Sequence, residues 1–127
     1  MTDKKILIVD DEKDVCEALK ETLEHDGFAV KTFGSGPEAI EVFEREPFDL
    51  VLVDIRLEGK VTGIDVIKAC TCASGKPKIA VISATPLRLL QPIFKEQKVA
   101  GLINGFLEKP SDMMPQVLIK KIGDILK

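Results

Sequence analysis

The stretch ILIVDDE, Ile6–Glu12, poses the fold question, because four apolar residues run directly into three carboxylates. A short apolar run bounded by polar residues is consistent with a buried strand. The carboxylates of Asp10, Asp11 and Glu12 then lie at the end of that strand, where buried charge is costly unless it is compensated. The rest of the chain has to explain this concentration of negative charge.

Four more short apolar runs follow, and stretches of helical period separate them. The five predicted strands are Lys5–Val9, Phe28–Phe33, Asp49–Val53, Lys78–Ile82 and Gly105–Leu107. The clearest predicted helices span about 12–26, 64–72 and 114–126, and another opens at the capping box Ser35–Glu38. Strands that alternate with helices predict an α/β fold, with helices on both faces of a parallel sheet.

The segment 85–104 has the least regular pattern. Pro86 is able to open a helix, but Pro92 inside the same apolar stretch is expected to break it. We therefore expect a short turn and then a helix from about Pro92 to Lys98. The apolar residues exceed what one short helix buries, which favours core beneath an irregular loop and leaves a docking patch as the alternative. These residues are Leu87, Leu89, Leu90, Ile93 and Phe94.

Composition narrows the class of protein. A chain of 127 residues predicts one domain over residues 1–127, and a net charge of −3 gives no sign of nucleic-acid binding. No apolar run approaches the roughly 18 residues that suggest a membrane span. The three cysteines are an odd number, so they do not form a complete disulfide framework. We expect a cytoplasmic protein.

Three aspartates are predicted to converge. Asp10 and Asp11 follow the first strand and Asp54 follows the third. Ligands of open parallel sheets bind outside the carboxyl ends of the strands, where the strand order reverses. Two carboxylates about 4 Å apart repel by about 4 kcal/mol at an effective dielectric near 20, so the group needs a cation or protons. An all-oxygen set favours Mg²⁺ over zinc.

With Asp54 in LVLVDIRL, Ser83 in AVISA and Lys109 in GFLEKP, the IVDDE motif completes a set of four strand ends. In this order, the set resembles the receiver domain of bacterial two-component response regulators, over nearly the whole chain. The resemblance implies a flavodoxin-like (βα)5 fold, a doubly wound parallel sheet of strand order 2-1-3-4-5. It also implies a signalling domain that is not a turnover enzyme.

The resemblance further implies a role for each of these side chains. Asp54 would be the nucleophile that takes a phosphoryl group from a sensor histidine kinase or a phosphotransfer protein, while Ser83 and Lys109 contact the phosphoryl oxygens. Phosphoryl transfer needs mostly positioning and charge neutralisation, which these residue types supply. The implied Mg²⁺ ligands are Asp10, Asp11, an Asp54 oxygen and the backbone carbonyl of Arg56. The output would be a downstream protein or a fused output domain.

Switching in this family involves the hydroxyl at Ser83 and an aromatic residue on the fifth strand, which Phe106 matches. The residues that tune dephosphorylation correspond to Arg56 and Thr85. Two departures from the family pattern concern loops. After Asp54 the chain has Leu57-Glu58 and a longer GKVTG turn, and the interval from Ser83 to Lys109 is also longer than usual.

Rival readings have specific requirements. A Mg²⁺-dependent phosphatase of similar topology needs a second aspartate two residues after the nucleophile, where Arg56 stands. A flavin-binding domain needs a phosphate-cradling loop after the first strand, where acids stand instead. We interpret Glu12 as the first-turn acid of the following helix rather than as a ligand, and His25 as a surface residue. A cis Lys109–Pro110 bond is also expected.

Overall fold

The computed structural model describes residues 4–56, 62–70 and 76–127. Within them, strands and helices alternate along the chain, as the sequence predicts. The strands are β1 (Lys5–Val9), β2 (Ala29–Phe33), β3 (Leu50–Asp54), β4 (Lys78–Ser83) and β5 (Gly105–Glu108). The α-helices are α1 (Lys13–His25), α2 (Gly36–Phe43), α3 (Gly63–Cys70), α4 (Leu87–Glu96) and α5 (Pro115–Leu126). Two 3-10 helices, η1 (Ala100–Leu102) and η2 (Ser111–Met113), flank β5.

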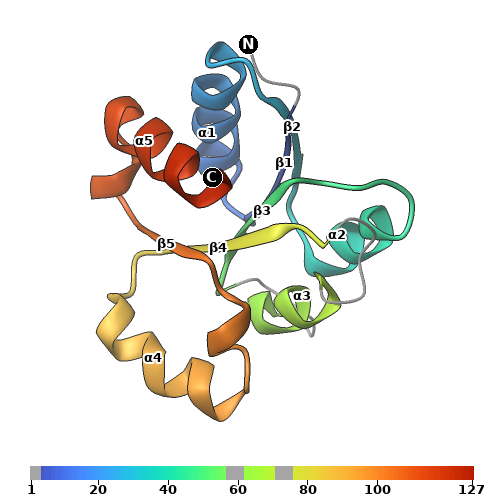
Figure 1. Ribbon diagram of the computed structural model, residues 1–127, viewed down its shortest axis with the longest axis vertical. Coiled ribbons are helices and arrows are strands. Elements are labelled where there is room, and N and C mark those ends of the chain that lie inside the picture. The colour runs from blue at the N-terminus through green and yellow to red at the C-terminus, as the bar shows by residue number, and fades with distance from the viewer. Residues whose placement is uncertain (1–3, 57–61, 71–75) are drawn as a thin grey trace.

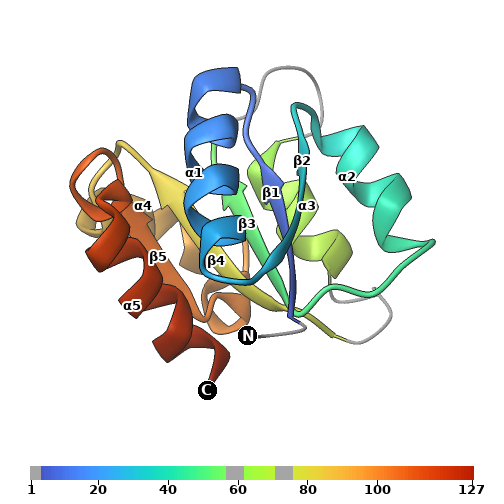
Figure 2. The same cartoon turned by 90° about the horizontal axis from the view of Figure 1, so that it is seen from above.

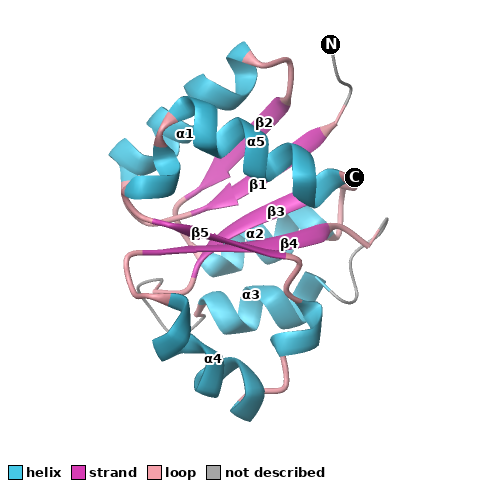
Figure 3. Cartoon of the chain, turned by 60° about the vertical axis from the view of Figure 1, so that its left-hand side comes forward, coloured by secondary structure: helices cyan, strands magenta, loops and turns pink. Residues whose placement is uncertain are grey.

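The strands form one parallel sheet of order β2-β1-β3-β4-β5. Helices α1 and α5 cover one face, and α2, α3 and α4 cover the other (Figures 1 and 3). Seen from above, the sheet runs between these two helical layers (Figure 2). The strand order reverses between β1 and β3, so the predicted doubly wound flavodoxin-like fold is confirmed.

Alternate strand residues divide the interior into two cores. Leu7, Val51 and Val81 face α2, α3 and α4, whereas Ile8, Leu52 and Ile82 face α1 and α5. Side chains of a strand point to opposite faces in turn, so continuous apolar runs are what a sheet covered on both faces requires. This explains why the five runs are apolar throughout.

Helix α2 begins where the sequence predicts. The Ser35 hydroxyl accepts a hydrogen bond from the Glu38 N–H at 3.5 Å, as an N-cap does, and donates to the Glu38 carboxylate at 2.9 Å. Pro37 stands in the first turn, where its missing N–H has no helical partner to lose. Helix α1 ends before Gly27, whose φ of 96° is a left-handed conformation that glycine adopts readily.

The prediction for the segment 85–104 was wrong. Helix α4 starts at Leu87, directly after Pro86, and continues through Pro92 to Glu96. Burial outweighs the lost hydrogen bond, because Leu90 and Phe94 stand four residues apart and both enter the core. The expected irregular loop over core is therefore a regular helix. Its outer side carries exposed Leu89 and Ile93.

Some predictions fall on residues outside the described ranges. These are Leu57, Glu58, most of the following turn, and the last residues of the helix predicted to end at Cys72. The described part of that helix, α3, ends at Cys70, which is buried as expected.

Candidate functional site at the carboxyl edge of the sheet

The register of the sheet brings the predicted residues to one edge. Val9 is paired with Val53 and Ser83 with Glu108, so the residue after β1 lies level with Asp54 and the residue after β5 lies beyond Ser83. These next residues are Asp10 and Lys109. The ladder also continues past the strand ends, because the Lys109 N–H donates to the Ser83 carbonyl at 2.9 Å.

The same local turn recurs at three strand ends. In each case a side-chain oxygen accepts a hydrogen bond from the backbone N–H two residues further on. The three pairs are Asp10 with Glu12 at 2.8 Å, Asp54 with Arg56 at 2.9 Å and Ser83 with Thr85 at 3.0 Å. Short polar side chains form such turns readily, and each one fixes the orientation of the side chain that it uses.

The Lys109 ammonium joins two of these turns. Its Nζ atom lies 2.8 Å from Asp10 Oδ2 and 2.9 Å from Asp54 Oδ2. The Lys109 side chain is only 10% exposed, Asp10 is 0% exposed and Asp54 8%. Because both partners are buried, this contact is screened far less than a surface ion pair.

Burial and charge act in opposite directions on these groups. Burial raises the pKa of the Asp10 carboxyl above its ordinary value, although hydrogen bonds from Lys109 and Glu12 lower it. Burial by itself lowers the pKa of the Lys109 ammonium, but its bonds to Asp10 and Asp54 outweigh that effect and raise the pKa. Lys109 therefore stays charged. Its single positive charge neutralises only part of the negative charge of Asp10 and Asp54, so a further cation would be attracted to them.

Four carboxylates at this edge form a possible cation site. Asp10, Asp11, Glu12 and Asp54 each offer an oxygen atom, and these atoms lie within 4.8 Å of one another. A hard divalent cation such as Mg²⁺ takes oxygen ligands of this kind, and a buried carboxylate such as Asp10 requires compensating positive charge. The donor set therefore fits the predicted magnesium ion.

The interpretation of Glu12 as a first-turn acid was wrong, whereas its exclusion from the magnesium ligands stays a prediction. Glu12 is the N-cap residue of α1 rather than a first-turn acid, and its Oε1 atom lies 3.4 Å from Lys109 Nζ. Its side chain is 63% exposed, so it adds charge at the rim. Its backbone is held close to the site, because the Glu12 N–H donates to Asp10 Oδ1 at 2.8 Å.

Two further neighbours of the site escaped prediction. A Cβ atom at Gly63 would lie 2.4 Å from the Asp54 carbonyl oxygen, so only glycine lets α3 begin this close to β3. The Cys16 thiol contacts the Asp10 carbonyl oxygen at 3.2 Å, and burial raises its pKa to about 11. A sequence shows neither contact, because both depend on how separate elements pack.

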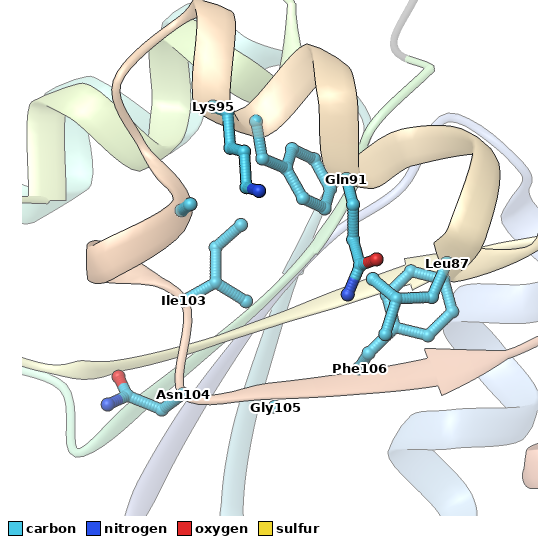
Figure 4. A pocket seen from close by; sticks show the side chains of 9 residues that line it. Leu87, Gln91, Lys95, Ile103, Asn104, Gly105 and Phe106 are labelled. Carbon is cyan, nitrogen blue, oxygen red and sulfur yellow. The ribbon is translucent and has the colours of Figure 1, made fainter.

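The remaining predicted residues lie around this edge. Phe106 is half-buried on the α4 side of β5, beside Leu87 (Figure 4). Arg56 is exposed two residues after β3, and Thr85 is half-buried two residues after β4. The Lys109–Pro110 bond is cis, as expected. His25 is exposed in the last turn of α1.

Known proteins resemble this chain in sequence and in fold. The family model described as the response regulator receiver domain matches residues 6–122. The chain belongs to this family. Receiver domains are signalling domains of two-component systems, so the suspected resemblance is confirmed at the level of the family.

Curated relatives and solved structures similar to this chain are also response regulators. The chain is 34% identical to the DNA-binding response regulator MtrA of Mycolicibacterium smegmatis, over 96% of this chain and 58% of the relative. It is 34% identical to the response regulator PilR of Pseudomonas aeruginosa, over 89% of the chain and 24% of the relative. The chemotaxis response regulator CheY4 of Vibrio cholerae has a TM-score of 0.81 at 26% identity, over 98% of this chain and 100% of CheY4.

The receiver domain corresponds to only part of the curated relatives. It spans 58% of MtrA and 33% of the sensory transduction protein RegX3 of M. smegmatis, which is 40% identical over 60% of this chain. The functions of the remaining parts of MtrA and RegX3 therefore do not apply to this chain. In the described ranges, no helix combines the length and the apolar character that crossing a bilayer requires.

Proposed function

We propose that residues 1–127 form one phosphoacceptor receiver domain in which Asp54 accepts a phosphoryl group from a sensor histidine kinase or a phosphotransfer protein. The observation that carries this proposal is the Lys109 ammonium held between Asp54 and Asp10, at 2.9 and 2.8 Å. It places a positive charge beside a nearly buried carboxylate at the edge where ligands of this fold bind.

In the proposed reaction, a carboxylate oxygen of Asp54 bonds to phosphorus. The phosphorus–nitrogen bond to the donor imidazole breaks, and its electron pair stays on the imidazole. The Asp54 carboxylate is already oriented by the Arg56 N–H at 2.9 Å. Charge on the transferring group spreads over three oxygen atoms, so positioned donors are the main contribution of the protein.

Two side chains are placed to supply such donors. The Lys109 ammonium has three N–H groups, and those that contact carboxylates in the free protein can turn to phosphoryl oxygens. The Ser83 hydroxyl oxygen accepts a bond from the Thr85 N–H at 3.0 Å, so its own hydrogen is available for donation. We propose that Ser83 and Phe106 then carry the change toward the output surface.

We propose that Mg²⁺ is held by Asp10, Asp11, an Asp54 oxygen and the backbone carbonyl of Arg56. When bound, it supplies positive charge beside the phosphoryl oxygens. The cluster of carboxylate oxygens supports this assignment. The Asp10 side chain would be the most firmly fixed ligand, because it is fully buried and accepts bonds from Glu12 and Lys109.

The partners and the location follow as proposals. The phosphoryl donor would be a histidine kinase or a phosphotransfer protein. The phosphorylated domain would control a protein target or a fused output domain. We place the protein in the cytoplasm, where cysteines stay reduced, because Cys16 and Cys70 are both buried free thiols. A phosphatase of this topology would need an acid at the position of Arg56, where this chain has arginine.

Intact mass spectrometry tests the proposal. The protein is incubated with acetyl phosphate and Mg²⁺, and a base-labile adduct with the mass of one phosphoryl group is expected. The adduct should disappear in Asp54→Asn and in the presence of a chelator. The matched control is Asp14→Asn, which removes an exposed acid from the first turn of α1 and should leave the adduct intact. An adduct that persists in Asp54→Asn, or none from either acetyl phosphate or phosphorylated kinase domains, overturns the assignment.

A further inference from the structure

A cavity separates α4 from the start of β5, away from the acidic edge. Its volume is about 360 Å³, at the small end of the range of about 300–1,000 Å³ that is usual for ligand pockets. Its apolar wall is formed by Leu87, Phe94, Ala100, Ile103 and Phe106. Figure 4 shows α4 on one side of this space and β5 on the other.

Two polar side chains of α4 extend into the same space. Gln91 and Lys95 stand four and eight residues after Leu87, so the three share one stripe of the helix. Their polar ends point from α4 toward the strand side, where Ile103 and Phe106 lie (Figure 4). Within the described ranges, neither side chain has a hydrogen bond or an ion pair.

The opposite rim is fixed. The Asn104 side-chain oxygen accepts a bond from the Ile79 N–H at 2.9 Å, and the Asn104 N–H donates to the Ile79 carbonyl at 2.7 Å. The strand side of the cavity is thus tied to β4. Among the residues that the structure describes, Gln91 and Lys95 are unpartnered donors on the helix side, so a ligand would place its polar end toward α4 and its apolar body against β5.

The chemistry of the lining selects the ligand. Lys95 is the one charged residue that lines the cavity within the described ranges, and it carries a single positive charge. A phosphate dianion generally requires several donors or an arginine fork, whereas one ammonium and one amide match one carboxylate. Apart from Gln91, Lys95 and the rim residue Asn104, the side chains of the lining are apolar and include two phenylalanine rings.

We propose that this cavity binds a small amphipathic monocarboxylic acid, with its carboxylate at Lys95 and Gln91 and its apolar body between Phe94 and Phe106. Phe106 is also the proposed switch residue, and it lies on β5 three residues before Lys109, which directly follows that strand. The ligand and the phosphoryl group would therefore bias one element from two sites. This second step rests on the proposed function, and the coupling is reciprocal in binding free energy.

Binding is measured first, on the unphosphorylated protein, by titrating sodium phenylacetate into ¹⁵N-labelled protein and following the amide NMR signals. Saturable shifts are expected at Gln91, Lys95 and Phe106. Lys95→Met should weaken the affinity about tenfold, the usual scale for a hydrogen bond to a charged group. Arg88→Met is the matched control, because it removes an exposed cation of the same helix that does not line the cavity, and it should leave the affinity unchanged.

Two more arms test the position and the charge of the site. Ala100→Leu fills the cavity and should abolish the shifts without altering the Lys95 charge. Neutral phenylacetamide has nearly the same shape and should bind much more weakly. Equal binding of the amide, no saturation, or shifts confined to the outer side of α4 at Leu89 and Ile93 would each overturn the proposal.

The coupling is tested separately, with the protein treated with acetyl phosphate and Mg²⁺. The phenylacetate Kd is expected to change severalfold once Asp54 is phosphorylated, and not to change in Asp54→Asn under the same treatment. An unchanged Kd on phosphorylated protein overturns the coupling alone. If no adduct forms, the proposed function fails, whereas the titration of the unmodified protein still decides the binding site.

Discussion

The two ends of β5 are built differently. Past its carboxyl end, the Lys109 ammonium is held by two buried carboxylates, and the Lys109 N–H is held by the Ser83 carbonyl. Beside its other end, Gln91 and Lys95 face a cavity without a partner among the described residues. The first end is already fixed in the free protein, whereas the second offers donors and space to something else. Substitutions at the two ends should therefore have different consequences.

Removing the cation from the fixed end should have the largest effect. Lys109→Met leaves Asp10 and Asp54 buried beside each other without a positive charge, and is expected to lower the free energy of unfolding by about 3–5 kcal/mol. The control is Lys121→Met, whose partner Asp112 forms a more exposed pair at 2.7 Å, and it should cost about 1 kcal/mol or less. Urea denaturation without Mg²⁺ measures both.

Equal losses in the two variants would contradict the view that Lys109 is structurally essential to the acidic edge. Adding Mg²⁺ should reduce the deficit of Lys109→Met, because positive charge returns to the cluster. It should leave the deficit of Lys121→Met relative to the unsubstituted protein unchanged, since Asp112 is not among the clustered carboxylates.

On the cavity side, the inner and outer leucines of α4 should differ sharply. Leu90 is 5% exposed and packs in the core, whereas Leu89 is 52% exposed. Leu90→Ala is expected to lower the free energy of unfolding by about 2–4 kcal/mol, and Leu89→Ala to change it by about 0.5 kcal/mol or less. Denaturation of the pair checks this, and comparable losses would mean that the outer side of α4 is covered in solution.

The contrast also explains which parts were predictable from the sequence. Strand-end chemistry was visible, because Asp10, Asp54 and Ser83 directly follow apolar runs, and Lys109 follows the fifth run after one residue, Glu108. A parallel sheet brings such strand ends to one edge. The close approach at Gly63 was not visible, because it depends on how α3 packs against β3. The polar residues of the site could therefore be identified from the sequence, whereas the close packing at Gly63 could be seen only in the structure.

Helix α4 was mispredicted for a physical reason. A local rule set the cost of Pro92 in a helix interior, but the burial of Leu90 and Phe94 depends on β4, β5 and the other helices of the same face. The rule gave the cost of the missing N–H at Pro92, but it did not include the free energy gained by burying Leu90 and Phe94. The same cost should therefore still be measurable in the folded protein.

Replacing Pro92 tests this directly. Pro92→Ala restores a helical N–H donor to the Arg88 carbonyl and is expected to raise the free energy of unfolding by about 2 kcal/mol. This is the roughly 3 kcal/mol penalty of an interior proline, reduced by the greater freedom of the unfolded chain. Pro37→Ala, in the first turn of α2, should change it by less than about 1 kcal/mol. A loss of stability in Pro92→Ala would show that contacts of the ring outweigh the missing bond.

The smallest expected effect tests how far the fixed end of β5 extends toward α5. Asp112 Oδ2 accepts bonds from Lys121 Nζ at 2.7 Å and from the Glu108 N–H at 2.8 Å. Burial raises the pKa of the Asp112 carboxyl, but these bonds outweigh it and hold the pKa below the ordinary value of 3.8. The ionised carboxylate therefore stabilises the folded state above that pH and loses this effect as the pH falls through the lowered pKa.

Asp112→Ala should accordingly lower the free energy of unfolding by about 1 kcal/mol at pH 7. The difference from the unsubstituted protein should shrink as the pH falls below 3.8, where the carboxyl of the unfolded chain becomes protonated first. Urea denaturation over a series of pH values measures this difference. A gap that widens toward acid would mean that the pKa of Asp112 is raised on folding, and that its bonds to Lys121 and Glu108 do not hold that end of β5 in solution.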